Sequence, residues 1–168
     1  FAVGVDRDLA TLLKRGQPLS AGVQRENVRV AARALAPLAQ AHELVISHGN
    51  GPQVGFILRR SEIADGQVPT VPVQYAVGDT QGAIGFMFQN ALGNALLRKG
   101  LRTPVVTLVT QTLVDRRDPA FGRPDKPIGS FLTEDVARRL AADLDWTVMR
   151  DGDRGWRRSI ASPQPVRV

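Results

Sequence analysis

The chain has 168 residues, of which 43% are hydrophobic and 23% charged, with a formal net charge of +6 and no cysteine. This composition predicts one soluble folded domain, and it excludes a disulfide framework and thiolate metal sites. No apolar run reaches the roughly 20 residues of a membrane-spanning helix, so we expect no membrane partner and a cytoplasmic location. The arginines are scattered and are not interleaved with aromatic residues, which favours a solvated surface over a nucleic-acid partner.

The first two thirds of the chain alternate between helical and extended patterns. Apolar residues recur at helical spacing after Ser20, a candidate N-cap, whereas β-branched residues dominate the extended segments. The expected elements are, in chain order, a helix over residues 20–40, a strand over 43–47, a helix over 52–60, a helix over 78–100 and a strand over 103–114. This alternation predicts an α/β fold with a mainly parallel sheet flanked by helices.

The pattern changes after Val114. Residues 115–129 contain three prolines and two glycines without any period, which indicates a loop or an excursion from the sheet. Thr133 is a candidate cap for a following helix, and residues 146–149 and 156–160 form a candidate β-hairpin. We therefore expect an N-terminal α/β lobe over residues 1–114 and a small protruding α+β subdomain over residues 115–165; that the lobe binds substrate is implied only by the family resemblance described below.

The motif HGNGPQVG, residues 48–55, lies between an expected strand and an expected helix. A glycine-rich turn at a helix N-terminus lets backbone amides approach a phosphate or carboxylate, and the Asn50 side chain adds a neutral donor. The alternative is that the glycines only serve a tight turn. His48 could orient a carbonyl or phosphate, or it could equally be satisfied by backbone hydrogen bonds.

The motif is one of several segments that resemble the carbamate kinase family, within the amino-acid kinase fold. The matching segments are LLKRGQPLS (12–20), QRENVRVAA (24–32), ELVISHGNGPQVG (43–55), TQGAIGFM (80–87) and DPAFGRPDKPIG (118–129). The resemblance implies a three-layer sandwich and phosphoryl transfer between carbamoyl phosphate and ADP, giving ATP and carbamate. It also implies that members pair as homodimers.

The resemblance places functional residues on this sequence. It implies that Gly49, Asn50 and Gly51 bind substrate, with His48 beside them, and that Lys126 is catalytic. Positioning and charge neutralisation by amides and an ammonium group suit phosphoryl transfer. With two histidines and no carboxylate at ligand spacing we expect no protein-built metal site, and Mg²⁺ would arrive with ADP or ATP.

Two departures from the family pattern leave alternatives open. The family opens with a glycine-glycine-asparagine loop, whereas this chain has Gly4 followed by Asp6 and Asp8. The segment GNALLRKG (93–100) resembles that loop, but it stands at the end of a helical pattern rather than after a strand. We also expect the family's nucleotide-binding C-terminal half to be absent, and no Walker A sequence occurs. The chain could act with a complementing C-terminal half, bind anions or a partner without catalysis, or be a degenerate remnant without activity.

Overall fold

A computed structural model describes residues 17, 18 and 20–168, so the expectations for Gly4, Asp6 and Asp8 lie outside the described residues. Backbone contacts divide the chain into two compact units, each discontinuous in sequence. The first contains residues up to 50 together with 79–109, and the second contains 51–78 and 110–168. No helix among the described residues is long and apolar enough to cross a membrane.

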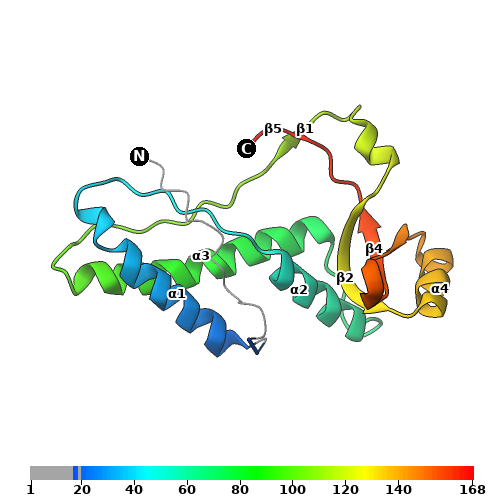
Figure 1. Cartoon of the computed structure of the whole chain (residues 1–168), viewed down its shortest axis with the longest axis horizontal. Helices are drawn as coiled ribbons and strands as arrows, with labels where there is room; N and C mark the ends of the chain where they lie inside the picture. The colour runs from blue at the N-terminus through cyan, green and yellow to red at the C-terminus, as the bar shows by residue number, and fades with distance from the viewer. Residues whose placement is uncertain (1–16, 19) are drawn as a thin grey trace. The chain divides into compact units, whose positions relative to one another are not determined.

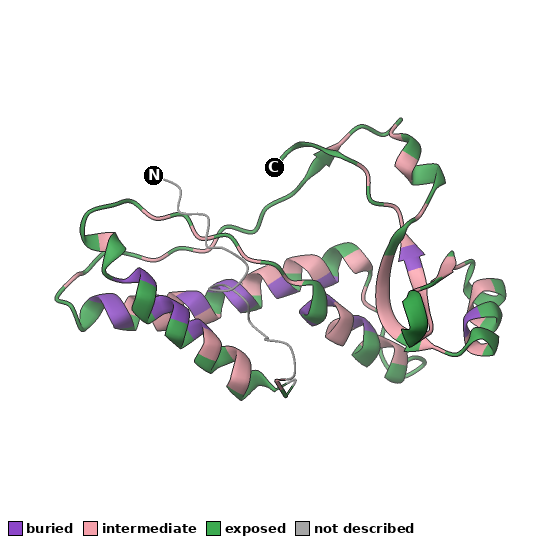
Figure 2. Cartoon of the chain, viewed as in Figure 1, coloured by how far each residue is buried: buried purple, intermediate pink, exposed green. Residues whose placement is uncertain are grey.

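Two helices form the core of the first unit (Figure 1). Helix α1, Ala21–Leu35, begins as predicted at Ser20, whose Oγ accepts a hydrogen bond from the Val23 N–H at 3.2 Å. It packs on helix α3, Val73–Leu97, and Figure 2 shows buried positions gathered where the two meet. The buried contact residues are Val28, Ala31, Ala32, Leu35 and Ala36 from α1 and its C-cap, and Ile84, Phe88, Leu92, Ala95 and Leu96 from α3.

Helix α3 begins five residues before the predicted start and ends where expected. Pro72 supplies the first acceptor, because its carbonyl receives the N–H groups of Tyr75 and Ala76 at 3.0 Å. At the other end Gly100 adopts a φ of +76°, and the Leu101 N–H returns to the Leu96 carbonyl at 3.0 Å. This is the glycine stop of a helix, so residues 93–100 are a helix terminus rather than a phosphate loop.

The two segments predicted as strands in this unit are extended, but among the described residues neither 43–47 nor 103–112 is paired as a strand. Burial nevertheless alternates along both: Ile46 and Val105 pack against the α1–α3 core, whereas Val45 and Val106 are 65% and 74% exposed. Alternation is the pattern of a strand with one covered face. A strand is also defined by hydrogen bonds to a neighbouring strand, and apolar periodicity does not predict whether such a neighbour is present.

The second unit is built on helix α2, Gly51–Ile63, which packs against strand β2, Lys126–Leu132. Val54 and Leu58 of α2 are buried with Ala76 from the first turn of α3, and Ile128 of β2 packs against them. The helix predicted over residues 52–60 is therefore confirmed. The loop predicted over 115–129 is wrong at its end, because Lys126 already begins a strand.

A three-stranded antiparallel sheet, in the order β2-β4-β3, completes the second unit. The predicted hairpin is confirmed: β3 and β4 are adjacent and antiparallel, with Arg150 opposite Trp156. Thr133 holds the N-cap position of α4 without a side-chain cap. The remaining elements are η1 Leu38–Gln40, β1 Leu113–Val114, η2 Pro119–Gly122, α4 Glu134–Leu144, β3 Val148–Arg150, η3 Gly152–Arg154, β4 Trp156–Ile160 and β5 Pro165–Arg167.

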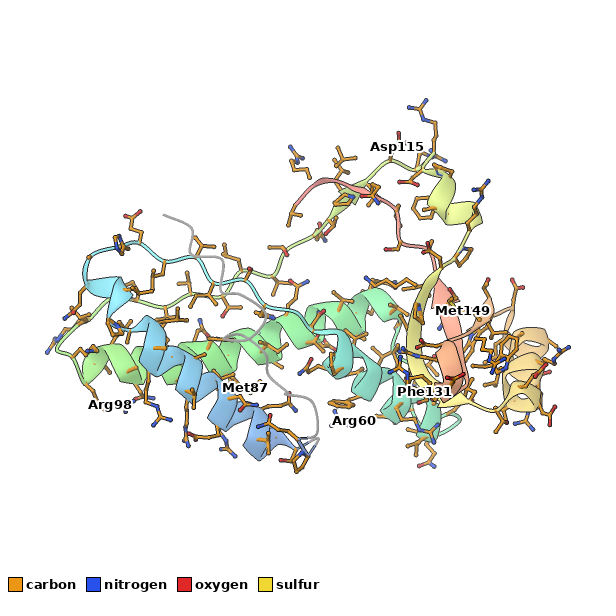
Figure 3. The ribbon with its side chains drawn as sticks, in the orientation of Figure 1. Arg60, Met87, Arg98, Asp115, Phe131 and Met149 are labelled. Carbon is orange, nitrogen blue, oxygen red and sulfur yellow. The ribbon has the colours of Figure 1, made fainter. Side chains whose placement is uncertain are left out.

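Charged side chains tie the loops of this unit to its sheet. Phe131, labelled in Figure 3, has the guanidinium carbons of Arg154 and Arg157 at 4.7 and 4.9 Å from its ring centroid. Both arginines also pair with Asp151, whose carboxylate lies 3.0 Å from Arg157. That hydrogen bond from Arg157 lowers the pKa of Asp151. The turn at residues 151–155 is thereby anchored to β2 and β4.

Candidate functional site

The motif residues form the end of an extended segment and the start of a helix. His48, Gly49 and Asn50 are the last residues before α2, and Gly51 is the first residue of that helix. Side chains along this segment alternate, with His48 and Asn50 partly buried and Gly49 exposed. Gly49 therefore lies on the solvent-exposed face of the segment, whereas the side chains of His48 and Asn50 lie on the opposite, partly buried face.

Helix α3 supplies the residues that hold the loop within the first unit. The Nδ2 of Asn50 donates to Thr80 Oγ1 at 3.0 Å, and Thr80 is only 3% exposed. The ring of His48 stacks on Phe88, with centroids 6.2 Å apart and planes inclined by 14°. Nδ1 of His48 also lies 3.3 Å from the Gly49 carbonyl oxygen. The ring of His48 thus contacts Phe88 and the Gly49 carbonyl, and the role of His48 in binding stays a prediction.

The first two glycines of the motif, Gly49 and Gly51, are not required by the backbone or by packing. Neither Gly49 nor Gly51 has a positive φ, and a Cβ built at either position would meet no atom within 4 Å. A tight turn that demands glycine would show the opposite, as at Gly155, whose φ is +119°. The alternative that these glycines only serve a turn therefore lacks support, and the space beside them is open.

The start of α2 is suited electrostatically to an anion. Its first turn carries no acidic side chain, and its last turn carries Arg60. A helix N-terminus presents unpaired N–H groups and the positive end of the helix dipole, which together favour a phosphate or carboxylate. Asn50 adds an uncharged amide directly before this terminus. The arrangement can bind an anion without a titrating group.

Lys126 begins β2 and is exposed, while the backbone around it is held by the neighbouring strand β4. It lies opposite Ile160 of β4 in the sheet, and the Ser159 hydroxyl donates to the Pro124 carbonyl at 2.8 Å. None of the ion pairs between described residues involves Lys126. The strand therefore presents an ammonium group that no carboxylate of the described chain neutralises.

A groove of about 880 Å³ between α1 and α3 contains none of the predicted site residues. Arg25, Arg29 and Arg33 of α1 and Arg98, which directly follows α3, line it around Met87; Met87 and Arg98 are labelled in Figure 3. Glu26, also in its lining, pairs with two of these arginines. The groove adds positive charge to the first unit, which attracts anions generally. Asn94, also in the lining, donates from Nδ2 to the Asn90 carbonyl oxygen at 2.7 Å, so the fixed polar side chains Glu26 and Asn94 bond to neighbours in the groove itself and define no ligand.

Metal-binding side chains do not gather in the part of the chain that the structure describes. No group of three histidine, aspartate or glutamate residues there could hold a metal ion. Divalent magnesium would have to be held largely by phosphate oxygens and water, as is common for this ion. The described residues thus fit an anion site better than a metal centre.

Sequence reasoning missed Thr80 and Phe88 as parts of the site. Thr80 opens the segment TQGAIGFM, which was used for the family resemblance but was given no role. The available signal was a polar residue on an apolar helix face. Thr80, Ile84 and Phe88 follow one another at intervals of four, so Thr80 shares the buried face of the two apolar residues. A buried hydroxyl needs a hydrogen-bond partner, so the sequence indicates that a partner exists without identifying it.

Comparisons with known proteins identify carbamate kinases as similar chains. A carbamate kinase of Pyrococcus furiosus is 45% identical over 157 residues, which cover 92% of this chain and 50% of the relative. A carbamate kinase of Haemophilus influenzae is 45% identical over 158 residues, which cover 94% of this chain and 49% of the relative. The solved carbamate kinase from Giardia lamblia bound to AMP-PNP superposes with a TM-score of 0.84 at 35% identity, over 99% of this chain and 52% of that one. No family model matches the chain. The chain spans about half the length of the curated relatives it matches, and the likeness in structure confirms the predicted fold class.

Proposed function

We propose that this chain, a homologue of the N-terminal half of carbamate kinases, binds the phosphoryl group of carbamoyl phosphate at residues 48–51. One observation carries the proposal: Gly49 and Gly51 have no backbone need for glycine, and the space where their side chains would lie is open. Glycine is the residue that leaves backbone N–H groups accessible to a ligand. Open space at two such positions beside a helix N-terminus is what an anion site requires.

The reaction proposed for the complete protein is transfer of this phosphoryl group to ADP. The bond from phosphorus to the carbamoyl oxygen breaks, its electron pair stays on the departing carbamate, and a β-phosphate oxygen of ADP forms the new bond. Because the transferred oxygens stay negative, catalysis depends on positioning and on positive charge. Lys126 is our candidate for that charge, and its fixed backbone and unpaired ammonium support the assignment.

Magnesium is proposed to accompany the nucleotide rather than to reside on this chain. The described residues offer no cluster of ligands for it. When bound with ADP or ATP, the ion would offset phosphate charge. The contribution of residues 48–51 would be to orient the acyl phosphate and to shield its oxygens from water.

A complementing protein segment is the partner that the surface supports. Val45, Val106 and Leu108 are 65%, 74% and 78% exposed, although they belong to extended segments in which Ile46 and Val105 pack against the core. Side chains that alternate with packed ones lie on the opposite face of an extended segment. When that second face is also apolar, it favours burial against another layer. We assign this partner to the half of a carbamate kinase that the present chain does not span.

Calorimetric titration with fresh carbamoyl phosphate tests the binding site. We expect Gly49→Ala and Gly51→Ala to weaken binding about tenfold or more, because a methyl group would enter the space reserved for the anion. Their thermal stability should be unchanged or raised, since alanine restricts the unfolded chain. Gly55→Ala is the matched control, because Gly55 also has open space and no positive φ.

Equal losses in all three variants, or none in any, would contradict the assignment of the site. Inorganic phosphate serves as the comparison ligand: equal affinity would mean a simple anion site without preference for an acyl phosphate. The transfer reaction is tested by ATP formation from ADP, magnesium and carbamoyl phosphate, with the chain alone and mixed with the C-terminal half of a relative. Turnover that is lost in Lys126→Ala but kept in Lys99→Ala supports the catalytic assignment.

A further inference from the structure

One face of α3 presents three buried residues to the extended segment that leads into the loop. Thr80, Ile84 and Phe88 follow one another at intervals of four, and their exposed fractions are 3%, 1% and 6%. Residues at this spacing lie above one another on a helix. The face is apolar except for one hydroxyl, which stands at its N-terminal end.

The extended segment places every second side chain on this face. Ile46 packs against the cluster that contains Ile84 and Phe88, and His48 stacks on Phe88. Asn50, the third residue of the series, reaches Thr80 by the hydrogen bond of 3.0 Å between Nδ2 and Oγ1. Two apolar contacts therefore fix the path of the segment, and one polar contact fixes the last side chain.

We propose that Thr80 is a positioning residue, whose hydroxyl fixes the orientation of the Asn50 amide for the phosphoryl group; this rests on the proposed function of the loop. An asparagine side chain carries a donor and an acceptor on the same carbon, so its orientation decides whether an anion meets N–H or oxygen. By accepting from Nδ2, Thr80 restricts rotation of that group. The second N–H and Oδ1 then keep fixed directions.

Loss of the hydroxyl should disorder this amide without removing any group that touches the ligand. In a Thr80→Val variant the side chain keeps its branched shape, but Nδ2 of the partly buried Asn50 loses its acceptor. Other rotamers of Asn50 then become accessible, including those that direct its oxygen toward the anion. Binding should weaken because only part of the population presents a donor.

Three variants separate positioning from packing. We expect Thr80→Val to weaken binding of carbamoyl phosphate about fivefold, the equivalent of one ordinary hydrogen bond, whereas Thr80→Ser should stay within about twofold of the parent. Ile84→Val removes one methylene from the same buried face and should lower the melting temperature without changing affinity. If Thr80→Ser binds as poorly as Thr80→Val, the methyl group matters and the proposal is overturned.

A second measurement follows Asn50 directly and needs no ligand. The side-chain amide of Asn50 gives a pair of signals in a ¹⁵N–¹H correlation spectrum, assigned by their loss in Asn50→Ala. Thr80→Val should shift these signals and speed their exchange with water, and Ile84→Val should leave both in place. Unchanged Asn50 signals in Thr80→Val would overturn the positioning role. A parent chain with responsive Asn50 signals but no affinity for carbamoyl phosphate would instead refute the function proposed for the loop.

Discussion

The two units hold their candidate functional residues by different means. In the first unit, side-chain contacts with α3 hold His48 and Asn50, and the segment that carries them has no strand partner among the described residues. In the second, Lys126 is part of a hydrogen-bonded sheet, opposite Ile160. A sheet backbone cannot shift without breaking its ladder, whereas a segment held by side chains can move by tenths of an ångström.

This difference predicts how each unit tolerates added atoms. A clash between an added methyl group and the sheet backbone should lower the free energy of unfolding strongly, because neither partner can move. A clash with one of the extended segments should lower the free energy of unfolding less, because these segments can move toward solvent. Two glycines, one in each unit, allow the comparison to be made with the same substitution.

The largest effect is expected for Gly155→Ala in the second unit. Gly155 has a φ of +119°, and a Cβ there would lie 2.8 Å from the Leu132 carbonyl oxygen of β2. Strain and a clash with fixed backbone together should lower the free energy of unfolding by about 3 kcal/mol. Urea denaturation measures this loss. Gly152→Ala is the control, because its φ of +60° gives strain alone, with no atom within 4 Å.

A loss at Gly155 no greater than at Gly152 would show that β2 yields, contrary to the rigid sheet described above. The αL conformation costs an alanine about 1 kcal/mol, so the control has a defined expected size. The difference between the two variants therefore measures the backbone clash together with the added strain at Gly155, whose φ of 119° and ψ of −157° lie outside the αL region.

A smaller effect is expected for Gly85→Ala in the first unit, despite a closer contact. Its Cβ would lie 2.1 Å from Thr107 Cγ2, a side-chain atom on an extended segment that is not paired as a strand. Overpacking should cost about 2 kcal/mol, offset in part by the better helix propensity of alanine. The net loss, about 1 kcal/mol, is again measured by urea denaturation.

Combining Gly85→Ala with Thr107→Ala tests the origin of that loss. The second substitution removes both of the closest atoms, so the pair should recover about 1 kcal/mol relative to additivity. Strict additivity of the two losses would mean that Thr107 is not what opposes the new methyl group. A loss at Gly85 larger than that at Gly155 would reverse the order of rigidity assigned to the two units.

The sequence predicted those elements that local chemistry specifies. Ser20 as a cap, Gly100 as a helix stop and the hairpin around residues 151–153 are all confirmed, because each depends on neighbours in the chain. The strand at Lys126 was missed because Pro124 and Pro127 indicate a loop, whereas Pro127 stands within β2, opposite Ser159. Proline within a strand is detected only when its pairing partner is known.

The site was predicted less completely than the fold. The motif itself directs attention to residues 48–51, since glycine, asparagine and a helix start adjoin one another there. Thr80 lies thirty residues further along the chain, and only the packing of α3 on the segment brings it to Asn50. Sequence spacing cannot reveal a contact of this kind, although a buried hydroxyl on an apolar face indicates that a partner exists.

The smallest effect concerns the charge that anchors the turn of the second unit. Asp151 has a lowered pKa, chiefly because Arg157 donates a hydrogen bond to it. A carboxyl group with a lowered folded-state pKa stabilises the fold above its unfolded pKa of about 3.9, and this contribution disappears as pH falls through the folded value. Asp151→Asn should therefore melt at a lower temperature than the parent at pH 6.

That difference in melting temperature should shrink as the pH is lowered below about 4, because the protonated parent then carries no charge either. Thermal melts of both proteins between pH 6 and pH 2.5 measure it, with Asp143→Asn, on the exposed side of α4, as the control. A gap that stays constant across this range would mean that the carboxylate contributes through shape rather than charge. The arginine pair on Phe131 would then be sufficient to hold the turn against the sheet.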